Sequence, residues 1–168
     1  MVNFNNKNKI KFLDSIPTAT IISTTNTLTY KSKFNFSYMD FYQEAAQKFS
    51  DWPEKQLLEL LNKLYHYSAQ PLQYWKNQKI GSGKHRYSVL EVYGSFPSKS
   101  DFVHPKHVPH EAMWSRFRLD SDARLIGFVV PSEFNKKEHI TTKFLFDTNT
   151  FYVVFLDIDH RFYIPQKK

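Results

Sequence analysis

The amino-acid sequence predicts an α+β fold, in which an N-terminal strand or hairpin and a helical hairpin precede a twisted antiparallel sheet that the helices cover on one face. Residues 53–69 place leucines at helical spacing, and strand-like apolar segments follow at 85–94, 113–119, 123–130 and 151–163. Aromatic residues make up 17% of the chain, which favours a β-rich or α+β core over a helical bundle.

The N-terminal elements are expected in the order strand, helix, helix. Residues 18–30 are rich in Thr and Ile, which favours a strand or hairpin, and residues 37–49 have the pattern of a short helix. The helix at 53–69 has Pro53 and Glu54 in its first turn, where both are favourable. Its apolar stripe consists of Leu57, Leu60, Leu61, Leu64 and Tyr65.

The later strands are expected to form neighbouring antiparallel pairs. Arg116 and Arg118 alternate with apolar or small residues, so the two arginines should share one face of the sheet. Residues 119–124 form a short Asp- and Ser-rich turn between two strands, which is typical of an antiparallel pair. Residues 95–112 and 131–150 fit neither a strand nor a helix pattern and are predicted to be long loops.

Composition restricts the class of protein. Net charge is +7, from 23 Lys and Arg against 16 Asp and Glu, which favours polyanionic partners but also fits a merely basic protein. The absence of cysteine excludes disulfides, thiolate zinc sites and cysteine nucleophiles, and fits a reducing compartment. The longest apolar runs have six residues and there is no apolar signal segment, so we expect a cytoplasmic protein without membrane contact. Residues 1–12, rich in Asn and Lys, predict a flexible leader before a single domain at 13–168.

Two motifs are weak candidates for chemistry. The first is a loop with three imidazoles at three-residue spacing, His104, His107 and His110, which could bind zinc or nickel and support a metal-dependent hydrolase. The intervening prolines prevent a regular helix from gathering them on one face, so an exposed loop is the alternative. The second is "GSGKHRY" at 81–87, in which the lysine leads into a strand rather than a helix. A basic hairpin tip that carries Lys84 and Arg86 is therefore favoured over a phosphate-binding loop.

The third candidate site combines the arginine-bearing strands with the C-terminal "DHRFY". RNA cleavage without a metal needs a base for the 2′-hydroxyl, a cation for the charged phosphate and an acid for the leaving oxygen. The sequence offers these groups as Arg116, Arg118, Arg124, His160, Arg161 and Tyr163. The alternative is that the arginines form ordinary surface ion pairs with Asp120, Asp122, Asp157 and Asp159.

These last segments resemble the RelE/ParE-type toxins of bacterial toxin–antitoxin systems. The resemblance covers roughly residues 18 to 163 and is specific in "WSRFRLDSDARLIGFVV" and "FYVVFLDIDHRFY". Such chains run from a strand through a helical hairpin into an antiparallel sheet, carry Arg-x-Arg and a further Arg on the middle strands, and end near His-Arg and Tyr. This chain departs from the pattern in its length, in its two long loops and in the strand at 85–94.

The resemblance implies a RelE-like endoribonuclease that needs no metal or cofactor. Its partners would be RNA, alone or on the ribosome, and a cognate antitoxin protein. His160 would then act as acid or base, Arg161 would stabilise the transition state and Tyr163 would stack or orient. The substrate-binding residues would be Arg116, Arg118, Arg124, Lys84 and Arg86, with Asp157 and Asp159 orienting the arginines.

Two questions stay open at the level of sequence. In an unbroken strand His160 and Tyr163 point to opposite faces, so a bulge or a strand end between them is required if both are to join one site. The same basic sheet also suits a non-enzymatic nucleic-acid-binding or protein-binding module of phage or plasmid origin.

Overall fold

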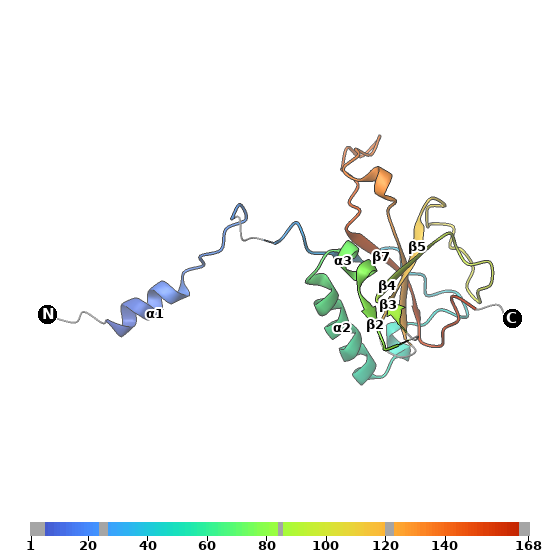
Figure 1. Cartoon of the computed structure of the whole chain (residues 1–168), viewed down its shortest axis with the longest axis horizontal. Helices are drawn as coiled ribbons and strands as arrows, with labels where there is room; N and C mark the ends of the chain where they lie inside the picture. The colour runs from blue at the N-terminus through green and yellow to red at the C-terminus, as the bar shows by residue number, and fades with distance from the viewer. Residues whose placement is uncertain (1–5, 24–26, 84–85, 120–122, 165–168) are drawn as a thin grey trace.

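A computed structural model describes residues 6–23, 27–83, 86–119 and 123–164, and it confirms the α+β class (Figure 1). A five-stranded sheet is accompanied by helices and by a small two-stranded hairpin. The elements in chain order are α1 (Lys7–Ser15), β1 (Lys33–Asn35), η1 (Phe49–Asp51), α2 (Glu54–Ser68), α3 (Leu72–Asn77), β2 (Lys79–Ile80), β3 (Tyr87–Ser88), β4 (Leu90–Gly94), β5 (Met113–Arg118), β6 (Arg124–Val129), η2 (Ser132–Phe134) and β7 (Thr150–Asp157).

The main sheet has the strand order β1-β7-β6-β5-β4. Strands β4 to β7 form a continuous antiparallel series, which confirms the predicted neighbours at 113–119, 123–130 and 151–158. The prediction of a wholly antiparallel sheet is wrong at one edge, because β1 pairs with β7 in parallel. A parallel pair needs a long connection, and here α2, α3 and the other strands lie between β1 and β7 in the sequence.

One face of the sheet is covered by α2 and α3, as predicted. The predicted apolar stripe is right for Leu57, Leu60 and Leu64, which pack against the core, and wrong for Leu61 and Tyr65, which are 62% and 84% exposed. Leu60 and Tyr67 of α2 are buried, and the ring of Tyr67 stacks on Phe117 of β5 with centroids 4.7 Å apart. Trp75 of α3 donates its indole N–H to the Tyr67 carbonyl at 2.7 Å. A buried aromatic side chain of this kind contributes about 2 kcal/mol through the hydrophobic effect alone, so α2 and α3 are held mainly by their packing.

The second face is covered by irregular chain. The predicted loop at 95–112 contains neither helix nor strand, yet Phe102 and Val108 within it are buried against the sheet. They pack in a cluster that includes Trp114, Phe155 and Phe162. This loop is therefore a layer of the core rather than a surface excursion.

Two N-terminal predictions are wrong. The described part of 18–30 holds no strand, and Ile21 and Ile22 are 81% and 92% exposed, so this segment lacks the buried face that stabilises a strand. Residues 37–49 do not form the expected helix apart from the start of η1. The Asp40 carboxylate accepts the N–H of Tyr42 at 2.9 Å, a local bond that competes with helix formation.

The first residues of the chain differ from a simple leader. The predicted leader, residues 1–12, overlaps the short helix α1, which begins at Lys7 and ends at Ser15. Asn6 caps this helix, because its side chain accepts the N–H of Asn8 at 3.0 Å. None of its residues is buried, and the helix extends away from the body in Figure 1. It therefore contributes no side chain to the core.

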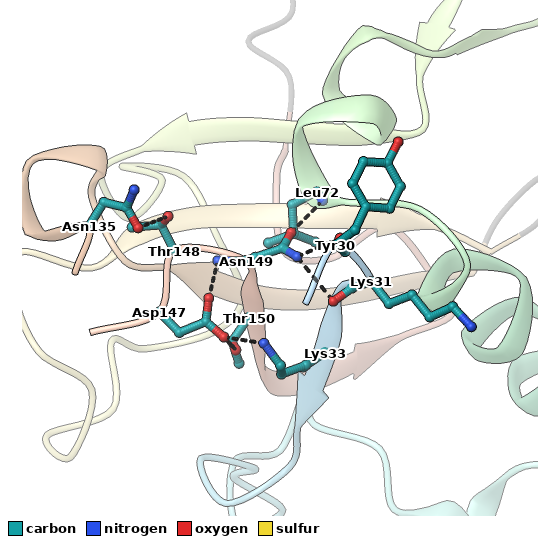
Figure 2. A network of polar contacts seen from close by, with 9 residues as sticks. All are labelled: Tyr30, Lys31, Lys33, Leu72, Asn135, Asp147, Thr148, Asn149 and Thr150. Carbon is teal, nitrogen blue, oxygen red and sulfur yellow. Dashed lines mark hydrogen bonds and ion pairs between the residues drawn. The ribbon is translucent and has the colours of Figure 1, made fainter. Parts of the chain in front are cut away.

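A polar network joins the start of β7 to the start of α3 (Figure 2). Asn149 accepts the N–H of Leu72 at 2.9 Å, which satisfies a free donor in the first turn of α3. Its amide also donates to the carbonyls of Tyr30 and Lys31 at 2.9 and 3.0 Å. One side chain thus connects three segments that are distant in the sequence.

Asp147 anchors the same network beside β1. Burial of Asp147 would raise its pKa, but hydrogen bonds from Lys33, from the Asn149 N–H and from Thr150 outweigh burial and hold the pKa below its ordinary value. The Lys33 ammonium lies 2.6 Å from the Asp147 carboxylate. These bonds fix β1 against the start of β7.

Candidate nucleic-acid interface

Three arginines lie together at one end of the sheet face that faces away from α2. In the backbone register of the sheet, Arg118 of β5 lies opposite Arg124 of β6, and Arg124 lies opposite Asp157 of β7. Arg116, two residues before Arg118 on the same strand, is on the same face, as the alternation predicted. The adjoining apolar part of this face holds Trp114 and Ile126, so the arginines form its polar end.

The partly buried Arg116 and Arg118 lie against tyrosines from the edge of the sheet. The Arg116 guanidinium lies 5.7 Å from the ring centroid of Tyr93, and that of Arg118 lies 4.7 Å from the ring of Tyr87. Tyr93 in turn stacks on Tyr163, with centroids 5.2 Å apart and an interplanar angle of 2°. We call this set the arginine–tyrosine face, defined as Arg116, Arg118, Arg124, Tyr87, Tyr93 and Tyr163.

Charge on this face is partly compensated. Glu91 of β4 accepts from Arg116 Nη2 at 2.5 Å and from Nε at 3.1 Å. Burial lowers the pKa of Arg118, the neighbouring Arg116 charge lowers it further, and Tyr87 and Glu91 oppose the change. Arg116 is therefore paired with a carboxylate, and burial is the main cause of the lowered pKa of Arg118.

The end of β7 brings His160 and Tyr163 to the same side. The strand ends at Asp157, and His160 has a φ of 57° in the left-handed region, which reverses the chain. The buried Asp157 carboxylate holds the reversal, because it accepts the N–H groups of Arg161 at 2.9 Å and Phe162 at 3.0 Å. The strand thus ends before His160, so the alternation that would place His160 and Tyr163 on opposite faces does not apply to them.

A small crevice forms where this reversal meets the arginines. Its volume is about 10 Å³, which leaves room for about one water molecule. The lining residues are Tyr93, Arg116, Arg124, Ile126, Asp157, His160, Phe162 and Tyr163. Predicted site residues from three strands and the C-terminal segment thus meet at one point.

Tyr93 is the lining residue that sequence reasoning missed. Its hydroxyl is buried and has no hydrogen-bond partner among the described residues. Burial raises the pKa of Tyr93 well above its ordinary value, although Arg116 opposes the change, so the hydroxyl is a neutral proton donor. The available signal was the strand pattern at 85–94, which places Tyr93 on an edge strand beside Arg116.

Arg161 does not line the crevice. Its Nε donates to Asp101 of the 95–112 loop at 2.9 Å, and Asp101 donates its own N–H to the Arg161 carbonyl at 3.0 Å. The hydrogen bond to Asp101 is the main cause of a raised pKa for Arg161, which is exposed. The expectation that Arg161 shares one cleft with Arg116 or Arg118 is wrong, because the loop supplies a carboxylate closer at hand.

The Asp157 carboxylate accepts the backbone N–H groups of Arg161 and Phe162, and Asp157 lies opposite Arg124 in the β6–β7 register. Asp159 is exposed. The orientation of the arginines by these two carboxylates stays a prediction. Arg86 is exposed just before β3, while Lys84 lies outside the described residues. The predicted turn at Asp120 and Asp122 is outside them too.

The three imidazoles of the 95–112 loop point to different partners. His104 packs against Trp114 with centroids 5.3 Å apart, and His107 bonds the Tyr38 carbonyl at 3.0 Å. His110 is exposed and lies 3.3 Å from Glu111. The part of the chain that the structure describes has no cluster of three or more His, Asp or Glu side chains suited to a metal.

The fold and this interface define a basic α+β protein with an arginine- and tyrosine-rich polar end on its sheet. Comparisons with protein-family models, with curated proteins and with solved structures found no match. Among the described residues, no helix has both the length and the apolar character that crossing a membrane requires.

Proposed function

We propose that the protein binds single-stranded RNA on the arginine–tyrosine face and cleaves it without a metal, in the manner of a RelE-like toxin. The observation that carries the proposal is the crevice, where His160, Tyr163, Arg116 and Arg124 meet. The chain order of β1, the α2–α3 helices and the antiparallel strands β4 to β7 supports it further. An antitoxin protein and the ribosome are partners that this proposal brings with it.

The proposed reaction is transesterification. A base removes the proton of the 2′-hydroxyl, the 2′-oxygen forms a bond to phosphorus, and the bond to the 5′-oxygen breaks as an acid protonates that oxygen. The products are a 2′,3′-cyclic phosphate and a free 5′-hydroxyl. The crevice has room for only about one water molecule, so the phosphate would lie across its mouth and not inside it.

Each role follows from position. His160 is the acid or base, because it lines the crevice and its ordinary pKa lies near neutrality. Arg116 contacts the phosphate, since it lines the crevice and is 15% exposed. Arg124 is buried and contributes its charge from beneath. Tyr163 offers a 49%-exposed ring for base stacking, and the neutral Tyr93 hydroxyl is a further donor.

Cleavage of RNA by purified protein tests the proposal. Wild-type protein, with and without translating ribosomes, should produce fragments with cyclic-phosphate ends, and His160→Ala should lower the rate about 100- to 10,000-fold while the protein stays folded. His110→Ala removes an exposed imidazole of another loop and is the matched control, with an unchanged rate. Wild-type protein that cuts no RNA under either condition, or His160→Ala that cuts as fast, would contradict the proposal.

Binding without cleavage is the second candidate function. Two observations favour it: Arg116 is already paired with Glu91, and Arg161 is paired with Asp101. Induced expression separates the two functions. Growth arrest relieved by His160→Ala, and not by Arg161→Ala, supports the enzyme with Arg161 outside the site. Tolerated expression of folded wild-type protein supports the binding module.

A further inference from the structure

Two adjoining cavities lie along α2, the first beside Trp52, Leu119 and Ala123 and the second between α2, α3 and the β2–β3 hairpin. Their volumes are about 640 and 550 Å³, and they share Lys63, His66 and Leu119 as lining residues. We call the second cavity the helix–hairpin groove. Its principal lining side chains are Lys63, His66, Tyr67, Tyr74, Trp75, Lys79, Tyr87, Val89, Arg118 and Leu119.

The groove has an aromatic floor and a basic rim. Trp75 and Tyr67 are buried and pack edge to face with centroids 5.1 Å apart, so the floor is rigid. Tyr74 and Tyr87 are 39% and 46% exposed and present their rings at the mouth. A rigid aromatic surface of this kind suits flat, unsaturated groups such as bases.

The rim is basic. Lys63 of α2, Lys79 of β2 and Arg118 of β5 line it together with His66, and no Asp or Glu of the described part of the chain is among its lining residues. Glu59 lines only the adjoining cavity. A concave site lined by three cations attracts an anionic chain, because the low-dielectric walls concentrate the field.

Arg118 connects this groove to the arginine–tyrosine face. Arg118 lines the groove, and its guanidinium lies over the ring of Tyr87. Arg116, two residues earlier on β5, lines the crevice. A strand that crosses the mouth of the crevice therefore meets Arg118 and then the aromatic rim. Cations and rings alternate along this path, as a single-stranded nucleic acid requires for its phosphates and bases.

We propose that the helix–hairpin groove is a second binding site, which takes the continuation of a single-stranded RNA whose phosphate lies at the crevice. The identity of the ligand as RNA rests on the proposed function, whereas the groove and its charges are independent of it. Lys63 and Lys79 contact phosphates, and Tyr74 and Tyr87 stack on bases. The groove thereby lengthens the bound segment and does not take part in the reaction.

Binding of a labelled oligouridine to the His160→Ala protein tests this site without cleavage. The double substitution Lys63→Ala with Lys79→Ala should weaken binding and reduce the log–log salt slope by about 1.4, since each phosphate contact on a single strand contributes about 0.7. Tyr74→Ala should weaken binding about 5- to 150-fold through lost stacking. The controls are Lys55→Ala and Tyr65→Ala, exposed residues of α2 outside the groove, which should leave affinity unchanged.

Thermal unfolding confirms that each variant is folded before binding is measured. Because Tyr74 packs on Trp75 with centroids 4.8 Å apart, the two exposed lysines carry the decision if Tyr74→Ala unfolds. RNA binding that Arg116→Ala weakens and the lysine variant does not would overturn the groove and leave the proposed function standing. RNA that binds through the groove lysines but is never cut by wild-type protein would support the groove and overturn the proposed cleavage.

Discussion

At the scale of single residues, the carboxylate of Asp157 decides where the predicted site forms. It is 3% exposed and accepts the two backbone N–H groups that follow the reversal at His160. Phe162, 1% exposed, then anchors the segment in the core, so Tyr163 is returned toward Tyr93. The Asp157 side chain is therefore a clamp on the backbone that follows β7.

Replacing this clamp should destabilise the protein. Asp157→Ala leaves two backbone donors without their acceptor, and hydrogen bonds to charged groups contribute about 1.5–3 kcal/mol each, so we expect the free energy of unfolding to fall by about 3–6 kcal/mol. Urea unfolding measures the loss. Asp159→Ala is the matched control, since Asp159 is exposed, and it should change stability by less than about 0.5 kcal/mol. Equal stability of the two variants would show that Asp157 does not hold the reversal.

At the scale of elements, the register of the β6–β7 pair shifts in the middle of the two strands, where both are buried in the core. The register shifts between Ile126 and Gly127, and both Val154 and Phe155 point into the cluster on the arginine side. A Cβ added at Gly127 would collide with the Tyr152 carbonyl oxygen and lie 2.7 Å from Cε1 of Phe151. Glycine is thus required here by close approach of the neighbouring strand.

Gly127→Ala should therefore cost more than an ordinary glycine substitution. The added methyl forces the central strands apart, and overpacking of this kind costs about 1–3 kcal/mol. Gly83→Ala provides the comparison, because Gly83 has a φ of +57° but no atom within 4 Å of the added Cβ, so only backbone strain of about 1–2 kcal/mol applies. Denaturant unfolding that finds Gly127→Ala as stable as wild type would contradict the register shift.

At the scale of the whole molecule, the positive charge matters through its distribution. The net charge of +7 is spread along the chain, yet Arg116 lines the crevice, and Arg118, two residues later on β5, lines the helix–hairpin groove together with Lys63 and Lys79. A spread charge accelerates encounter with polyanions, while a path of cations sets the length of strand that is bound.

RNA affinity should consequently fall steeply with salt. Each phosphate neutralised on a single strand contributes about −0.7 to the slope of log affinity against log salt, so Arg116→Ala should make the slope shallower by about 0.7. Fluorescence anisotropy between 50 and 200 mM salt, the span over which such losses are large, measures the change. Affinity that does not depend on salt, or no RNA binding at the lowest salt, would rule out the arginine–tyrosine face as a phosphate-binding surface.

The sequence by itself determined the elements whose signal is local. The leucine spacing of α2, the alternation that places Arg116 and Arg118 on one face, and the strands β5, β6 and β7 all follow from periodicity over a few residues. Only the tertiary structure decided the parallel pairing of β1 and the packing of the 95–112 loop as part of the core. It also decided the pairing of Arg161 with Asp101 and the place of Tyr93 in the crevice. These contacts join residues that are distant in the sequence, and no local pattern encodes which of several carboxylates or rings the fold brings within reach.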